Sequence, residues 1–347
     1  MKLRENERFL ELSMARRYTP NPPENGTDDY RCFVVDPHLT RPTVLTGSQF
    51  LPNNPEVVHH AIFFKLDPKD VRAARALDAA APGDGWTCFT GTGIGSQATQ
   101  LRGAPWLAAW APGAGESLAP PNTGFEMEPG THIIMQIHYN LLATGGKATG
   151  SDQSGIRLRL RSATKAITPL HTTLLVAPIE LPCAPGETGR LCDRTMALWD
   201  VSRRFGDEAG YQVAGLNLIC TGSLEPRPGN TQHCDQTIRA RMVVYAVAGH
   251  MHLLGTSIRV DLNPGSRDAW NLLNVRVYNF DDQSAHRLAE PVTVNPGDHL
   301  RVTCTHDATL RSKLPALKLL QPRYVVWGEG TSDEMCLGVV VWASRAA

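Results

Sequence analysis

Hydrophobic and polar residues alternate along short stretches of this chain, and glycine, proline and asparagine separate these stretches. Branched and aromatic side chains recur at every second position, which is the pattern of a strand with one buried face. Many short strands of this kind, with NPG turn signals between some of them, predict an all-β fold of antiparallel, jelly-roll-like β-sandwiches. The clearest strands are expected at 131–141, 155–162, 239–255, 257–265, 274–280 and 297–307.

Helical patterns are scarce, and we expect two short helices as insertions between strands. The first is an Ala-rich segment at 68–83, which Pro82 and Gly83 would end. The second lies at 193–210, with Asp193 as a candidate N-cap and Gly206 as a candidate stop. Neither segment changes the prediction of a β-rich protein.

The length of 347 residues predicts about two domains at roughly 150 residues each. The stretch 161–169 follows one run of strands and precedes the next. We therefore place a boundary there, giving an N-terminal β-sandwich domain at 1–163 and a C-terminal β-sandwich domain at 164–347. No sequence repeat relates the two halves.

Charge and hydropathy exclude several classes of protein. The 34 Lys and Arg residues balance 34 Asp and Glu residues, which excludes a strongly basic nucleic-acid binder and an acidic tail protein. No apolar stretch approaches the roughly 20 residues that cross a bilayer. We expect a small-molecule partner, no nucleic acid and no membrane span, and the lack of heptads favours a monomer.

The chain has eight cysteines, an even number, and no CxxC pair. This pattern favours disulfides over zinc, and the alternative is eight reduced, buried thiols in a cytosolic protein. No signal peptide is visible, because the first residues contain no apolar run of the required length. Because the cysteine pattern favours disulfides, we expect an exported protein, secreted or periplasmic, seen in mature form or as a fragment.

Two pairs of histidines suggest metal binding. His250 and His252 are two residues apart in a predicted strand, so their side chains share a face and can converge on one ion, with Met251 turned to the core. His59 and His60 are adjacent and face opposite ways on a regular strand. They can share a metal only if the backbone bulges or ends there, or if one binds through its other ring nitrogen. The alternative for each pair is ordinary packed or exposed histidines.

Two further residues are weaker signals taken alone. His138 lies in a predicted strand, where an isolated histidine is usually packed and hydrogen-bonded. Met335 near the end of a β-rich chain is usually core filler, but as a ligand its soft thioether would favour Cu(I). The remaining histidines, His306 among them, are interpreted as ordinary packed or exposed residues.

Taken together, the motifs resemble the copper type II, ascorbate-dependent monooxygenases, the family of peptidylglycine α-hydroxylating monooxygenase and dopamine β-monooxygenase. The resemblance runs from Tyr30 to Trp342 and lies in the order of the motifs. They are HH at 59–60, QIHYN at 136–140, GHMHLLG at 249–255, PGDHLRVTC at 296–304 and GEGTSDEMC at 328–336.

The resemblance implies two β-sandwich domains that each hold one copper and face each other across a solvent-filled cleft. His59, His60 and His138 would bind the electron-donor copper. His250, His252 and Met335 would bind the oxygen-activating copper, where dioxygen and a substrate C–H bond react. Ascorbate would supply electrons through the first copper. By resemblance, Gln136 takes part in the path between the coppers, and the alternative is a solvated polar residue.

The resemblance also implies disulfides between Cys32 and Cys88 and between Cys304 and Cys336. The second of these would tie a strand to the Met335 segment. Cys183, Cys192, Cys220 and Cys234 allow three pairings. We favour Cys183 with Cys192 and Cys220 with Cys234, although the resemblance does not decide between the three.

The sequence departs from the family where the peptide-hydroxylating branch anchors its substrate. Ala248 stands where that branch has an Arg, and Leu337 and Val339 stand where it has an Asn and a Tyr. We therefore expect a small, partly apolar organic substrate with an activated C–H bond, and not a peptidylglycine. Asp333 and Glu334 are open as residues behind the metal site or at the surface.

Two other functions remain open from the sequence. One is a copper-binding protein without enzyme activity, such as a chaperone or sensor, which the altered pocket residues would fit. The other is a β-sandwich adhesion or carbohydrate-binding module with incidental histidines, because a fold does not fix a function. The first predicts copper binding without ascorbate-driven oxygen uptake, and the second predicts no stoichiometric copper.

Overall fold

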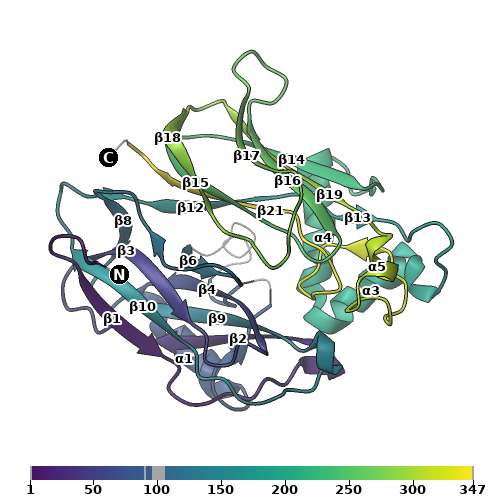
Figure 1. The fold of residues 1–347 in the computed structure, drawn as a ribbon, viewed down its shortest axis with the longest axis horizontal. Coiled ribbons are helices and arrows are strands. Elements are labelled where there is room, and N and C mark those ends of the chain that lie inside the picture. Colours follow the sequence, from purple (N-terminus) through teal and green to yellow (C-terminus); the bar gives the residue numbers. More distant parts are fainter. Residues whose placement is uncertain (1, 90, 96–105, 346–347) are drawn as a thin grey trace. The chain divides into compact units, whose positions relative to one another are not determined.

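The computed structural model describes residues 2–89, 91–95 and 106–345. The chain divides into two compact units, one of Met1–Thr173 with Val341–Ala347 and one of Leu174–Val340. The division falls within strands β12 (His171–Val176) and β21 (Leu337–Ala343). Figure 1 colours the chain in order from purple to yellow and labels its elements.

The first unit contains two sheets, and the paired strands are antiparallel except β8 and β11. The six-stranded sheet consists of β1 (Arg8–Ser13), β10 (Gly155–Ser162), β3 (Thr43–Leu51), β8 (Thr123–Met127) and β11 (Thr168–Pro169) in that order, with β7 (Ser117–Leu118) also on β3. The five-stranded sheet has the order β5 (Trp86–Thr87), β2 (Asp28–Val35), β9 (His132–Asn140), β4 (Val58–Leu66) and β6 (Trp106–Trp110).

Strand β9 is central to the five-stranded sheet and is buried on both faces. Its residues Ile133, Met135 and Ile137 pack in one core cluster with apolar residues of the other sheet. Ile134 points the other way, into a second cluster that contains the first disulfide and residues of helix α1 (Val71–Ala80). Because side chains alternate along a strand, Gln136 and His138 lie on this second face.

The second unit contains two four-stranded sheets and a two-stranded one. The first sheet has the order β12, β21, β15 (Met242–His250) and β18 (His286–Val294). The second has the order β14 (Thr231–Thr237), β19 (His299–His306), β16 (Gly255–Leu262) and β17 (Trp270–Val275), and β13 (Glu180–Leu181) pairs with β20 (Val325–Val326).

The two larger sheets of this unit pack face to face. A Cβ atom on Gly249 of β15 would lie 2.7 Å from Cγ2 of Ile258 on β16. A Cβ on Gly338 of β21 would lie 3.1 Å from Cγ2 of Val260, also on β16. Both β16 side chains are fully buried. The small residues therefore allow close approach of the sheets, and the predicted all-β class is confirmed.

The helices agree only partly with the prediction. Helix α1 ends before Pro82, as expected. Helix α3 (Arg194–Phe205) begins after Asp193, whose carboxylate accepts the Met196 N–H at 2.9 Å, and it ends at Gly206 with φ 89°. A further helix, α4 (Asp207–Thr221), follows directly. It was missed because its apolar residues occur around the whole helix and form no stripe.

The other helical segments among the described residues are short. They are α5 (Leu310–Lys313) and the 3-10 turns η1 (Pro23–Asn25), η2 (Pro68–Asp70), η3 (Leu142–Thr144) and η4 (Arg190–Cys192). None of the helices in the described part of the chain has both the length and the apolar character that a bilayer span requires.

Two predicted strands differ from the structure. The segment 239–255 is not one strand, because β15 ends at His250 and a turn leads into β16 at Gly255. The segment 274–280 leaves its strand at Val275. The Tyr278 hydroxyl beyond it accepts the Met251 N–H at 2.9 Å and donates to the Met251 C=O at 2.6 Å. A side chain thus takes the place of a strand partner just after β15.

All eight cysteines form disulfides. The pairs are Cys32–Cys88, Cys183–Cys192, Cys220–Cys234 and Cys304–Cys336. The first and last are the pairs that the resemblance implied, and the other two are the favoured pairs among three. The alternative of reduced thiols is not what the structure shows.

Candidate metal centres

The first set of candidate ligands, His59, His60 and His138, comes together on the five-stranded sheet. One ligand nitrogen from each ring lies within 4.8 Å of the other two. The Nδ1 atoms of His59 and His60 are 3.1 Å apart, and those of His60 and His138 are 3.3 Å apart. Nitrogens bound at about 2.0 Å to one tetrahedral ion are separated by about 3.3 Å. The spacing therefore fits a shared metal.

A break in strand pairing allows the adjacent histidines to meet. In the ladder of β4 with β9, Val58 pairs with Tyr139 and His60 pairs with His138. His59 is the extra residue between them, which is the arrangement of a β-bulge. The backbone thus bulges at the position where a shared site requires it.

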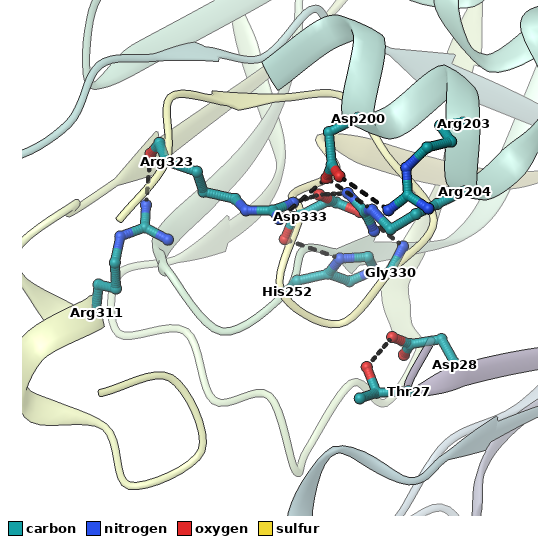
Figure 2. Close-up of polar contacts among 10 residues, drawn as sticks. All are labelled: Thr27, Asp28, Asp200, Arg203, Arg204, His252, Arg311, Arg323, Gly330 and Asp333. Atoms are coloured by element: carbon teal, nitrogen blue, oxygen red, sulfur yellow. Dashed lines mark hydrogen bonds and ion pairs between the residues drawn. The ribbon is translucent and has the colours of Figure 1, made fainter. Parts of the chain in front are cut away.

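Asp28 of β2 fixes the ring of His138. Its Oδ1 lies 2.9 Å from His138 Nε2, and both side chains are buried. Because a carboxylate only accepts, Nε2 carries the proton and Nδ1 keeps the lone pair for a metal. The Thr27 hydroxyl donates to the other Asp28 oxygen at 2.9 Å (Figure 2), and the Tyr30 ring stacks on His138 at 4.1 Å.

Gln136 is buried, so the solvated alternative is wrong. Its side-chain amide donates to the Cys88 C=O at 2.8 Å. It thus connects β9 to the disulfide segment on the face that carries His138. Its part in a path between two coppers stays a prediction.

In the second set, His250 ends β15 and His252 lies in the segment that follows, with their ring centroids 5.2 Å apart. His250 Nδ1 lies 2.5 Å from Oε1 of Gln283. The Gln283 amide nitrogen donates to the Phe280 C=O at 2.7 Å, which identifies the other amide atom as the oxygen. Since that oxygen only accepts, His250 carries its proton on Nδ1 and its lone pair on Nε2.

His252 is held in the same tautomer. Its Nδ1 lies 3.2 Å from the backbone C=O of Asp333, so Nδ1 is the protonated nitrogen (Figure 2). Its Nε2 is buried and has no hydrogen-bond partner among the described residues. A buried acceptor without a partner is unfavourable unless something binds it. The residues present therefore fit a metal at Nε2.

Glu334 connects His252 to Met335. Its buried carboxylate accepts the backbone N–H groups of His252 at 2.8 Å and Leu254 at 2.5 Å, and lies 3.3 Å from His306 Nε2. Burial raises the pKa of Glu334, but His306 and the backbone N–H of His252 outweigh it and leave the pKa below its usual value. Met335 follows directly and is also buried.

The surface alternative for Asp333 and Glu334 is wrong, because both side chains are buried. Three residues that contact candidate ligands were not predicted from the sequence: Asp28, Gln283 and His306. None of the three had a local signal, because each contact depends on how segments distant along the chain meet.

The three positions expected to shape the substrate pocket are apolar. Leu337 is buried, and Ala248 and Val339 are half-buried. None of these side chains can donate or accept a hydrogen bond.

Solved structures with some likeness to this chain have low scores. The coconut allergen cocosin is 9% identical, with 97% of this chain and 86% of that chain covered and a TM-score of 0.17. A Paenibacillus xanthan lyase is 12% identical, with 94% and 25% covered and a TM-score of 0.18. We draw nothing about fold or function from such values.

A family model gives the informative comparison. Residues 229–346 match the model described as copper type II ascorbate-dependent monooxygenase, C-terminal domain. The matched range contains His250, His252 and Met335, together with the Cys304–Cys336 disulfide that ties the Met335 segment to β19. This match supports the family resemblance for residues 229–346, which correspond to a C-terminal domain of the copper type II ascorbate-dependent monooxygenases.

Proposed function

We propose that this protein is a dicopper monooxygenase. It hydroxylates an activated C–H bond of a small organic substrate with dioxygen, and ascorbate or a similar one-electron reductant supplies the electrons. The observation that carries the proposal is the buried His59, His60 and His138 set, which lies outside the matched range of 229–346. A family C-terminal domain accompanied by a second metal-type cluster is what a two-copper enzyme requires.

Each proposed domain has its own part. Domain 1–163 holds the electron-donor copper with His59, His60 and His138, and domain 164–347 holds the oxygen-activating copper with His250, His252 and Met335. When bound, copper supplies one-electron redox chemistry and the binding of dioxygen.

The protein's own residues set which atoms face each ion. Asp28 keeps the His138 proton on Nε2, so Nδ1 is the donor there. Gln283 and the Asp333 C=O keep the protons of His250 and His252 on Nδ1, so Nε2 is the donor in the second set. The Met335 thioether adds a soft ligand, which favours the reduced ion.

The pocket residues support a substrate other than a peptidylglycine. Ala248, Leu337 and Val339 supply no charge for a carboxylate and no hydrogen bond for a peptide. The substrate is therefore small and partly apolar. The four disulfides support a secreted or periplasmic protein, which we propose acts as a monomer.

Metal content is the first test. After copper reconstitution and exhaustive dialysis, elemental analysis should find two coppers per chain, and ascorbate should then drive oxygen uptake coupled to substrate. Met335→Ala and His250→Ala should abolish hydroxylation while the protein stays folded. His286→Ala changes an exposed histidine outside both sets and is the matched control. Unchanged turnover in Met335→Ala and His250→Ala would refute the proposal.

The second candidate is a copper-binding protein without enzyme activity, such as a chaperone or sensor. The apolar residues Ala248, Leu337 and Val339 favour it, because they lack the substrate anchors of the peptide-hydroxylating branch. It predicts stoichiometric copper without ascorbate-driven, substrate-coupled oxygen uptake. One copper per chain would also favour this candidate, and zinc or no metal would remove both.

A further inference from the structure

The loop at 328–336 is folded around the side chain of Asp333. The Gly330 N–H donates to Asp333 Oδ2 at 3.2 Å, and the Asp333 N–H donates to the Gly330 C=O at 2.8 Å. A Cβ on Gly328 would lie 2.8 Å from the Asp333 Cβ, and a Cβ on Gly330 would lie 2.7 Å from Oδ2. The two glycines of the GEG sequence therefore leave room for this carboxylate and for no larger group.

Two arginines and a second aspartate close a ring around that carboxylate (Figure 2). Arg204 of α3 binds Asp333 with both terminal nitrogens, at 2.8 and 2.6 Å, and its Nε donates to Asp200 at 2.9 Å. Arg323 donates to Asp333 at 3.0 Å and to Asp200 at 3.0 Å. The ring thus joins helix α3, the segment before β20 and the 328–336 loop.

The ring is neutral and mostly removed from water. The exposed fractions are 2% for Asp333, 11% for Asp200, 14% for Arg323 and 15% for Arg204. Burial lowers the pKa of Arg204, but the carboxylates of Asp333 and Asp200 raise this pKa by more than burial lowers it. The guanidinium therefore stays charged. Buried ion pairs of this kind add little net stability, whereas paired guanidinium forks fix orientation closely.

What the ring orients is the backbone of Asp333, whose C=O accepts from His252 Nδ1 at 3.2 Å. A neutral imidazole can carry its proton on either nitrogen, and the hydrogen bond at one nitrogen decides which. If the Asp333 carbonyl moves away, no other acceptor at Nδ1 among the described residues keeps the His252 proton off Nε2. Nε2 is the nitrogen that has no partner among the described residues.

We propose that Arg204, Arg323 and Asp200 are positioning residues for His252: through Asp333 they hold it in the tautomer that leaves Nε2 open to a metal. The inference rests on the proposed function only in taking His252 as a metal ligand. It assigns to helix α3, an insertion between strands, an indirect part in the second metal set, through Asp333.

The test is made on metal-free protein labelled with 15N-histidine, in alkaline buffer where the imidazoles are neutral. Proton–nitrogen correlation spectra identify the tautomer of each ring, and His252→Gln assigns the His252 signals. We expect His252 and His250 to carry their protons on Nδ1. In Arg204→Met the two His252 ring nitrogens should shift toward each other as both tautomers are populated, while His250, held by Gln283, stays unchanged.

Arg203→Met is the matched control. Arg203 neighbours Arg204 on α3, is 43% exposed and reaches Asp200 only at 3.5 Å. Its substitution should leave the His252 signals in place. A folded Arg204→Met protein with an unchanged His252 spectrum would overturn the proposal.

Removing a buried charge can prevent folding, so Arg323→Lys is the second variant. It keeps the charge balance but loses the fork that bridges the two carboxylates. We expect a smaller shift of the His252 nitrogens in the same direction. If Arg204→Met does not fold, an unchanged spectrum in Arg323→Lys overturns the proposal by itself.

Copper affinity gives a second readout. Competition with a chromophoric Cu(I) chelator should show weaker binding by about 10- to 100-fold at the second set in Arg204→Met, with the first set unchanged. Because the NMR experiment contains no metal, it can succeed even if the protein proves not to be a monooxygenase. A tautomer shift of His252 in Arg204→Met, together with no copper binding by the wild type, would refute the proposed function. The role of the ring in orienting His252 would still hold.

Discussion

The two histidine sets differ in what holds them. In the first set, all three ligands and the supporting Asp28 lie on three neighbouring strands, β2, β9 and β4, and pairing between those strands fixes their positions. In the second set, only His250 lies in a strand. His252 and Met335 lie in connecting segments that the Glu334 carboxylate, the Cys304–Cys336 disulfide and the arginine ring tie together.

The groups behind the ligands also differ in charge. A carboxylate accepts the proton of His138, whereas a neutral amide and a backbone carbonyl accept those of His250 and His252. A carboxylate makes an imidazole a stronger donor to a metal. If both sets bind copper as proposed, this difference would favour the more highly charged ion in the first set and the reduced ion in the second.

Removing a ligand should have the largest effect, because it removes copper from one set and leaves the other set in place. We expect His138→Ala to lose the first copper and keep the second, and Met335→Ala to weaken only the second. Both should abolish ascorbate-dependent hydroxylation, because the proposed reaction needs both ions. Elemental analysis and oxygen uptake measure the two effects, and each variant serves as the control for the other. Retained turnover in either variant would show that the sets do not act together.

The disulfide beside Met335 is expected to have the next largest effect. In the chain-entropy model, its separation of 32 residues corresponds to about 4 kcal/mol of stability, against about 2.5 kcal/mol for the separation of 9 in Cys183–Cys192. Replacing both cysteines of a pair by serine and measuring denaturant unfolding tests this order. Only loss of Cys304–Cys336 should also weaken copper at the second set. Equal copper affinity in both double variants would contradict a role in holding Met335.

Asp28→Asn should make the first set resemble the second, since a neutral amide would replace the carboxylate. We expect copper at the first set to bind about 10-fold more weakly, with a larger loss for Cu(II) than for Cu(I). Asp29→Asn is the matched control, because Asp29 points to the opposite face and accepts from the Tyr18 hydroxyl at 2.6 Å. Competition titrations with the two oxidation states check the result, and equal losses in both variants would exclude a specific effect.

The smallest effect is expected from Gln283→Leu. The variant removes the acceptor for His250 Nδ1, but His250 stays at the end of a paired strand, so copper at the second set should weaken by less than about 10-fold. The same titration, with the first set as internal control, measures it. A loss as large as that in Arg204→Met would show that strand pairing does not protect His250.

Much of the fold could be predicted from alternation alone. The predicted strands at 131–141 and 155–162 agree with β9 and β10, although β9 is buried on both faces and its burial does not alternate. Helix α4 could not be found in this way, since Tyr211 and Ile219 are exposed and apolar while Val213 and Leu216 are buried. Periodicity cannot show which side of such a helix faces the core.

The candidate ligands could be proposed from short motifs, but the groups behind them could not. His59 and His60 required a bulge, and the sequence could state that condition without showing that it is met. Arg204 and Arg323 are 119 residues apart along the chain, and their common partner Asp333 belongs to a third segment. Such contacts arise from tertiary structure and leave no local pattern.

The Cys304–Cys336 bond has a consequence for where the protein can work. Met335 precedes one of its sulfurs, so the placement of a proposed ligand depends on a covalent link that the reducing cytosol does not maintain. A chain made there would keep every histidine and still lack the tie on its thioether segment. Recombinant production should therefore use an oxidising compartment, and protein purified with thiol reductants would give a misleadingly low copper count.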